Sequence, residues 1–186
     1  MDDLKLYMLL IGCTPPGRHT EQHDVFFCIG TSMKGLIPDI IDFWPEAQGQ
    51  MHVDGWREVT SVDGYEIKVI DRNAGNTAKE RQLFFINLGG YKQGVFDEPH
   101  FKFVTVQPDK AAAIKYAKGT WFYENVHFPG ATSHIDDKFG VDVDDIYEIG
   151  EILPAAQRDL YKLSIVKNDA IAADKLHLGY FKLSNL

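Results

Sequence analysis

The sequence has few cysteines, no long apolar run and no excess of basic residues, and each shortage argues against a class of protein. Two cysteines in 186 residues do not make a disulfide framework, so we expect a reduced, cytoplasmic setting. No apolar run approaches the roughly 20 residues that a membrane helix needs. The net charge of −8 argues against a broad nucleic-acid-binding face, because affinity for phosphates comes mainly from clustered Lys and Arg. We therefore expect neither nucleic acid nor a membrane as a partner.

Internal repetition is the strongest signal in the sequence. Residues such as Leu6, Gly12 and His23 recur at an offset of 77, as Leu83, Gly89 and His100. Further along the chain the offset becomes 82, and eight identities fall within 19 positions, where composition alone would give roughly one. The repeat then begins a third time and stops early. The sequence thus predicts a first repeat unit at 1–76, a second at 77–157 and a partial third repeat at 158–186, which could all pack as one compact domain.

Each repeat reads as strand–strand–helix–strand–strand. The runs 6–11 and 25–30 are β-rich and bounded by Gly and Pro, which predicts two strands joined by a loop. Apolar residues from Ile37 to Trp44 have helical spacing, and Pro38 indicates a helix that starts near it. The segments MHVDGWREV and YEIKVI predict a second hairpin.

These elements predict an α+β fold with mainly antiparallel sheets. The partial third repeat is expected to form a closing C-terminal β-hairpin. By symmetry, this hairpin would cover a sheet edge that the second repeat leaves open.

Two long motifs carry a resemblance to a known family. GCTPPGRHTEQHDVFFCIG, at 12–30, and HVDGWREVTSVDGYEI, at 52–67, resemble the signature stretches of a bacterial family known as domain of unknown function 1543. The resemblance covers the first half of the chain well and the second half more weakly. It implies a bacterial origin and one or two copies of the domain per chain. It implies no activity, substrate or cofactor, because none is established for the family.

Paired histidines and carboxylates recur in both repeats and are the candidate metal ligands. In a strand, residues i and i+2 point to the same face, so each repeat could present two imidazoles and two carboxylates to one divalent transition metal ion. The candidates are Glu21, His23, His52 and Asp54 in the first repeat and Glu98, His100, His134 and Asp136 in the second.

An architectural role for these histidines is the alternative. A His at the start of a strand can satisfy backbone groups, and an Asp before a Gly can simply make a turn. His177 keeps the position in the third repeat, where no His-x-Asp pair follows. Apart from a divalent metal, no cofactor is indicated.

Residues found only in the first repeat suggest a pocket for a polar ligand. Arginines can hold a carboxylate or phosphate in bidentate fashion, and a histidine can transfer protons near neutral pH. The alternative is a set of surface ion pairs of small energetic value. The candidate ligand-binding residues are Arg18, His19, Asp24, Trp56 and Arg57.

Cys13 is the one candidate nucleophile, since histidines and carboxylates lie near it in the sequence. Its equivalent in the second repeat is Gly90, which argues against catalysis. Cys28 lies among apolar residues of a predicted strand and should be core. In a hairpin closed by residues 13–22 it should lie opposite about residue 7, which argues against a disulfide bond to Cys13.

Two functions fit these patterns. The first is a binding module that recognises a small polar ligand or a protein partner through the first repeat, with a homodimer formed by edge strands. The second is a metal-assisted hydrolase or lyase, which requires the four ligands of the first repeat to converge in one pocket. The binding module instead predicts a patch around Arg18, Trp56 and Arg57.

Overall fold

The computed structural model describes residues 3–75, 81–128, 134–135 and 146–186, which belong to two compact units. Unit 1 consists of Met1–Gly75 with Leu153–Leu186, and unit 2 consists of Asn76–Ile152. The predicted fold class is confirmed: the chain is α+β, with mainly antiparallel sheets and short helices. None of the helices in the described residues is long and apolar enough to cross a membrane.

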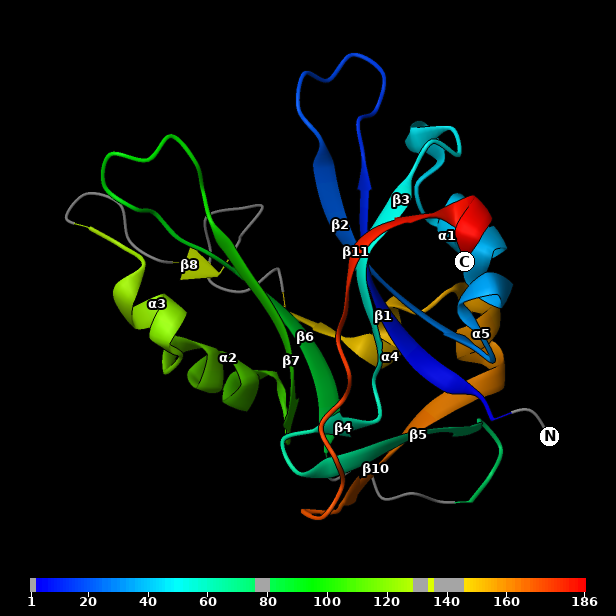
Figure 1. The fold of residues 1–186 in the computed structure, drawn as a ribbon. Helices are drawn as coiled ribbons and strands as arrows, with labels where there is room; N and C mark the ends of the chain where they lie inside the picture. Colours follow the sequence, from blue (N-terminus) through cyan, green and yellow to red (C-terminus); the bar gives the residue numbers. More distant parts are fainter. Residues whose placement is uncertain (1–2, 76–80, 129–133, 136–145) are drawn as a thin grey trace. The chain divides into compact units, whose positions relative to one another are not determined.

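A four-stranded antiparallel sheet organises unit 1 (Figure 1). Its order is β11-β3-β1-β2, and its strands are β1 (Lys5–Cys13), β2 (Gln22–Gly30), β3 (His52–Glu58) and β11 (His177–Lys182). The hairpin of β1 and β2 closes with Cys13 opposite Gln22, as predicted. Cys28 lies opposite Tyr7, which confirms the predicted register and keeps the two cysteines apart.

One face of this sheet carries the core of unit 1. A short 3-10 helix, η1 (Met33–Leu36), leads into α1 (Ile37–Phe43) and then η2 (Pro45–Ala47). The Ser32 hydroxyl accepts a hydrogen bond from the backbone N–H of Gly35, and Pro38 occupies the first turn of α1, where no N–H is needed. Ile40 of α1 packs against Leu9 and Ile11 of β1, all fully buried. Alternation along β1 therefore turns Gly12 to the opposite face.

The two segments expected to form a second hairpin belong to different sheets. β3 lies in the four-stranded sheet, whereas β5 (Tyr65–Asp71) lies in a three-stranded sheet with β4 (Ser61–Val62) and β10 (Tyr161–Lys167). A turn through Asp63 and Gly64, both with positive φ, joins β4 to β5. The prediction of one hairpin was therefore wrong, because the chain changes sheet after β3.

The C-terminal strands also differ from the predicted closing hairpin. β10 and β11 do not pair with each other: β10 pairs with β5 and β11 pairs with β3. Each strand covers an edge in unit 1 rather than one left open by unit 2. Asp174, between the two strands, accepts hydrogen bonds from the backbone N–H groups of Thr60 and Ser61 at 3.0 Å each. These hydrogen bonds fix the segment between β10 and β11 beside the residues that join β3 to β4.

Unit 2 repeats part of this arrangement. Its sheet has the order β7-β6-β8, with β9 also paired to β6, and α2 packs on it through Ala113 and Ala117. The elements are β6 (Gln82–Gly89), β7 (His100–Gln107), α2 (Lys110–Lys118), α3 (Trp121–Asn125), β8 (His134–Ile135), β9 (Ile146–Glu148) and α4 (Ile149–Ile152). Gly89 lies opposite His100 and His134, as Gly12 lies opposite His23 and His52. These are the residues that the sequence offsets align between the two repeats.

The remaining elements of unit 1 follow α4 or end the chain. They are α5 (Ala155–Leu160), which leads into β10, and the 3-10 helix η3 (Leu183–Asn185). Gln157 of α5 hydrogen-bonds to the backbone N–H and C=O of Ile29 at the end of β2.

Candidate metal centre

The sheet of unit 1 places four residues in one row across its strands. His23 of β2 and His52 of β3 both lie directly opposite Gly12 of β1, and Lys182 of β11 lies opposite His52. Directly opposite residues in antiparallel strands project to the same face. The row therefore brings two imidazoles together on the face away from α1, on either side of a residue without a side chain.

Gly12 leaves the space in which these side chains meet. A Cβ at this position would lie 2.6 Å from Oδ2 of Asp54, 2.7 Å from Nε2 of His52 and 3.1 Å from Cδ2 of His23. The first two distances are shorter than real Cβ contacts. The three side chains thus converge directly over the Gly12 backbone.

A β-bulge in β3 falls at Asp54, another member of this group. Leu10 lies opposite Gly55 and Ile11 lies opposite Val53, so Asp54 is an extra residue in β3. The register of β11 against β3 shifts at the same place. The bulge keeps Asp54 on the His52 face and returns Trp56 to the face where it packs on the core.

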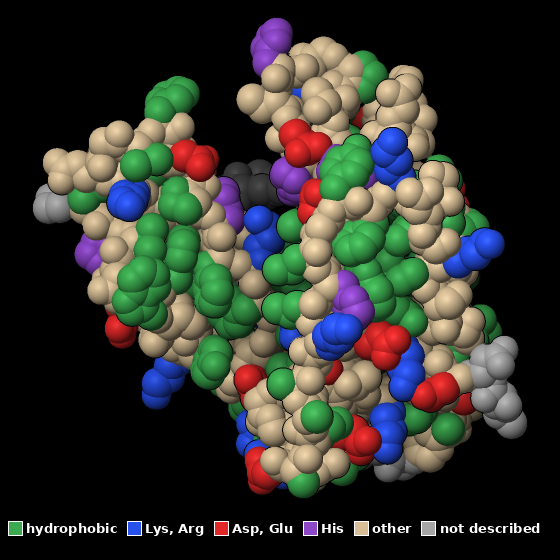
Figure 2. Space-filling view, viewed as in Figure 1, with side chains coloured by type: hydrophobic (Ala, Val, Ile, Leu, Met, Phe, Trp, Pro, Cys, Tyr) green, Lys and Arg blue, Asp and Glu red, His purple; other side chains and the backbone are tan. Residues whose placement is uncertain are grey.

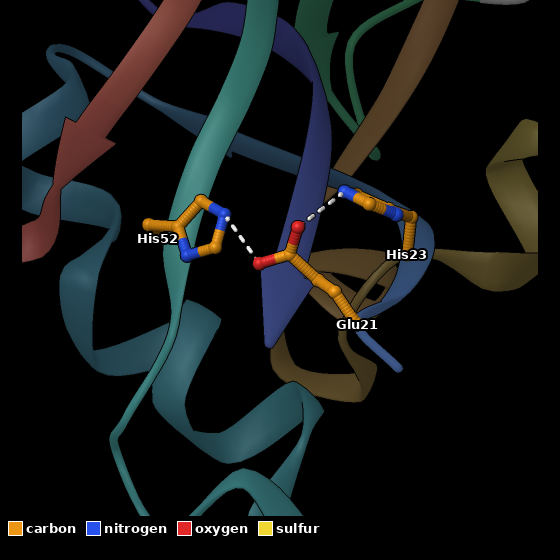
Figure 3. A group of neighbouring side chains, drawn as sticks. All are labelled: Glu21, His23 and His52. Carbon is orange, nitrogen blue, oxygen red and sulfur yellow. Dashed lines mark ion pairs between the residues drawn. The ribbon is translucent and has the colours of Figure 1, made fainter. Parts of the chain in front are cut away.

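Glu21 completes the group from the end of the loop that precedes β2. Its carboxylate lies between the two imidazoles, with Oε1 3.2 Å from Nε2 of His52 and Oε2 3.6 Å from Nε2 of His23 (Figure 3). The Asp54 carboxylate lies 3.2 Å from Nε2 of His52 and 3.0 Å from Nε2 of His23. Each imidazole therefore faces both carboxylates through the same ring nitrogen.

Two atoms at the centre of the group are buried and lack a hydrogen bond: Nε2 of His52 and Oδ2 of Asp54. Nε2 of His52 lies within ion-pair distance of both carboxylates, and Oδ2 of Asp54 lies 3.0 Å from Nε2 of His23, but neither atom makes a contact with the geometry of a hydrogen bond. The His52 side chain is only 7% exposed, and the Tyr180 ring packs 4.1 Å from its imidazole. A buried polar atom without a hydrogen-bond partner is costly, so a cation bound by these two atoms would stabilise the group.

An open cavity of about 520 Å³ borders the group. Glu21 and His52 contribute to its wall, together with Thr14, Tyr180 and Lys182. Figure 2 shows histidine and acidic side chains together on the surface of unit 1, with a basic side chain near them. A small ligand can therefore reach Glu21 and His52 from solvent.

The residues predicted to bind a polar ligand do not form one patch. Arg18 and His19 are exposed in the loop between β1 and β2, and Asp24 accepts a hydrogen bond from the N–H of Val25. Trp56 and Arg57 are neighbours in β3 and point to opposite faces.

Both of these β3 side chains have partners within unit 1. The Trp56 ring stacks on His177 with centroids 3.9 Å apart. Nη1 of Arg57 lies 3.6 Å from Oδ2 of Asp174, whose side chain is fully buried. Burial lowers the pKa of the Arg57 guanidinium, and the Asp174 charge opposes this shift. Arg57 is thus paired with a carboxylate of its own unit.

The equivalent group of unit 2 is only partly described. His100 begins β7 and is exposed, and Glu98 precedes it in the loop. The backbone of His134 pairs with Gly89, but its side chain and all of Asp136 lie outside the described residues. The four-residue group is therefore described in full only for unit 1.

The two cysteines are buried and free. Burial raises the pKa of the Cys13 thiol, and the nearby Glu21 carboxylate raises it further. Burial also raises the pKa of Cys28. A thiolate nucleophile needs the opposite shift, so the environment of Cys13 disfavours covalent catalysis.

Sequence reasoning missed two parts of the centre. Gly12 recurs as Gly89, but this recurrence indicated only a structural role and not a place in the centre. Lys182 has no signal in the sequence, because its position beside His52 depends on the pairing of β11 with β3.

The fold and the centre define a class: an α+β protein with a two-histidine, two-carboxylate group on an open sheet face. Residues 18–69 match the family model described as Domain of Unknown Function (DUF1543), which confirms the predicted resemblance for this part of the chain. All four residues of the group lie within this match. No curated protein matches the chain.

A solved structure shares the fold. The crystal structure of a protein Il1583 from Idiomarina loihiensis is similar with a TM-score of 0.57 and 24% sequence identity, over 97% of this chain and 98% of that chain. At this identity the similarity concerns the fold alone.

Proposed function

We propose that this protein binds one divalent transition metal ion in unit 1, through Glu21, His23, His52 and Asp54. The observation that carries the proposal is the convergence of two imidazoles and two carboxylates over Gly12, with buried atoms of His52 and Asp54 left without hydrogen bonds. A metal ion at this point would satisfy those atoms. Imidazole nitrogen and carboxylate oxygen are its usual protein ligands.

Zinc fits the spacing of these ligand atoms. Four ligands at zinc-ligand bond lengths, placed as a tetrahedron, lie roughly 3.3–3.5 Å from one another. The nitrogen–oxygen separations in the group are 3.0, 3.2, 3.2 and 3.6 Å, and each carboxylate meets the two imidazoles through different oxygens. One ligand atom each from Glu21, His23 and His52 lie within 4.8 Å of one another, so these three residues are placed to hold the ion, and the Asp54 carboxylate would shift to join them.

An ion-pair cluster without metal is the competing explanation. Such a cluster would be expected to align each imidazole N–H with one carboxylate oxygen, because hydrogen-bonded pairs are the favourable way to bury charge. Here the Nε2 atom of His52 lies equally far from both carboxylates and donates to neither. This geometry favours a shared ion over paired charges.

The test is the metal content of untagged protein purified without chelators and then dialysed against Zn²⁺. We expect at least one equivalent of zinc per chain by mass spectrometry. The variant His52→Ala should hold one equivalent less. His19→Ala is the matched control, because it removes an exposed histidine of the adjoining loop and should leave the metal content unchanged.

Two results would contradict the proposal: a chain that stays free of metal, or a His52→Ala variant that keeps the full amount. Circular dichroism of both variants would show whether a loss of metal reflects a loss of fold. A second equivalent that survives in His52→Ala would indicate binding through the histidines of unit 2.

Metal-assisted hydrolysis is a second candidate function, favoured by the cavity beside Glu21 and His52. A catalytic zinc site needs a position for water or substrate, which here would be a fifth ligand or would replace one carboxylate, and zinc lowers the pKa of a bound water. Zinc-loaded protein should then hydrolyse simple nitrophenyl esters or phosphate esters, and Asp54→Asn should reduce the rate. Equal rates for the loaded and the chelator-treated protein would exclude this candidate.

A further inference from the structure

The cavity beside the proposed metal centre has a basic side chain on its wall. Lys182 lies opposite His52 in the sheet, so both side chains project to the same face. It is the one lysine or arginine among the cavity-lining residues that the structure describes. Within the described part of the chain, no ion-pair partner accompanies this ammonium group.

The charges of the centre would leave Lys182 uncompensated. Two carboxylates balance a divalent ion when the histidines bind as neutral imidazoles, as metal binding requires. Lys182 then adds one positive charge next to a neutral centre. A small anion that bridges the ion and the ammonium group would find two positive partners, and charge-assisted hydrogen bonds are the strong ones.

The rest of the cavity suits a small polar molecule. Its volume of about 520 Å³ is within the usual range for small-molecule sites. Thr14, Gln50 and Ser184 add hydroxyl and amide groups to its wall. The exposed Tyr180 ring borders the same space, and its centroid lies 4.1 Å from that of the His52 imidazole.

We infer that the cavity binds a small oxyanion, a carboxylate or a phosphate, between the metal ion and Lys182. This inference rests on the proposed metal site, and it names the class of ligand that the site takes. Neither Arg18 nor Arg57, the arginines first considered for such a ligand, lines this cavity.

The experiment uses Co²⁺ in place of Zn²⁺, because its visible absorption reports changes in coordination. The full chain is first titrated with Co²⁺ alone and then, once loaded, with inorganic phosphate or with acetate. We expect the Co²⁺ spectrum to change when the preferred anion binds. The anion that binds more tightly shows whether the cavity prefers a phosphate or a carboxylate. Lys182→Met should weaken anion binding roughly tenfold or more, since it removes a hydrogen bond to a charged group.

Lys175→Met is the matched control. It removes the same charge from an exposed position a few residues earlier, beside a different cavity. Anion affinity should stay at the wild-type value in this variant, and Co²⁺ affinity should stay within about twofold in both.

The outcomes separate the two proposals. Failure to bind Co²⁺ would overturn both the metal site and the anion site. Binding of Co²⁺ with a spectrum that neither phosphate nor acetate changes would overturn the anion site alone. Equal anion affinities of Lys182→Met and Lys175→Met would also overturn it, because Lys182 would then play no part.

Discussion

Gly12 lies directly opposite His52, and a Cβ at Gly12 would come within 2.7 Å of its Nε2 atom. The four proposed metal ligands can therefore meet only because the central strand has no side chain at this position. The same backbone pairing occurs between Gly89 and His134 in unit 2. A substitution of Gly12 therefore tests the proposed metal centre without removing any of its ligands.

Substitution Gly12→Ala should abolish or strongly weaken metal binding. The new methyl group would displace His52 and Asp54 from the point at which they converge, so we expect zinc affinity to fall by roughly tenfold or more. Isothermal titration with Zn²⁺ measures the effect. Gly35→Ala is the control, because a Cβ there would make only an ordinary contact with Ser32. Unchanged affinity in Gly12→Ala would show that the ion binds elsewhere or that no site forms here.

Zinc should stabilise the folded protein. Its ligands come from the loop before β2 and from β3, so they assemble only on folding, and a ligand that binds the native state alone raises its stability. At a thousandfold excess over Kd, the gain is about 4 kcal/mol. Thermal unfolding with and without Zn²⁺ measures it. Mg²⁺, which prefers oxygen ligands, should have little effect. An equal shift in His52→Ala would point to a different binding site.

Local patterns predicted the first hairpin well. Gly and Pro bound the two strands of the β1–β2 hairpin, and the pairing of Cys28 with Tyr7 follows from the loop length alone. The sheet changes after β3 and before β11 could not be predicted in this way. They depend on contacts such as that of Asp174 with Thr60, residues 114 positions apart, for which the sequence has no local signal.

The candidate site was predicted in part. The i, i+2 spacing brought Glu21 and His23, and His52 and Asp54, into consideration, and the structure places these four side chains together. Their binding of a metal stays a prediction. The β-bulge at Asp54 and the position of Lys182 depend on pairing among three strands, which spacing along one strand cannot show.

The buried carboxylate of Asp174 should be important for stability. It accepts hydrogen bonds from Thr60 and Ser61 and lies beside the Arg57 guanidinium, so Asp174→Ala would leave a largely buried cation without its partner. We expect a loss of about 2–4 kcal/mol in the free energy of unfolding, measured with urea. Asp169→Ala, which removes an exposed carboxylate paired with Lys167, should cost less than about 1 kcal/mol. Similar losses for the two variants would argue against an anchoring role.

The thiols of Cys13 and Cys28 should be unreactive in the native state. Both side chains are almost fully buried, and burial raises the pKa of each thiol. Since a raised pKa keeps a thiol protonated, little thiolate forms at neutral pH, and the nucleophilic form is scarce. Titration with a disulfide reagent at pH 7.5 should therefore label neither cysteine in native protein and both in urea. Rapid labelling of Cys13 alone, identified by mass spectrometry and absent in Cys13→Ser, would instead mean that this thiol is accessible and activated. That result would reopen the question of a nucleophile beside Glu21.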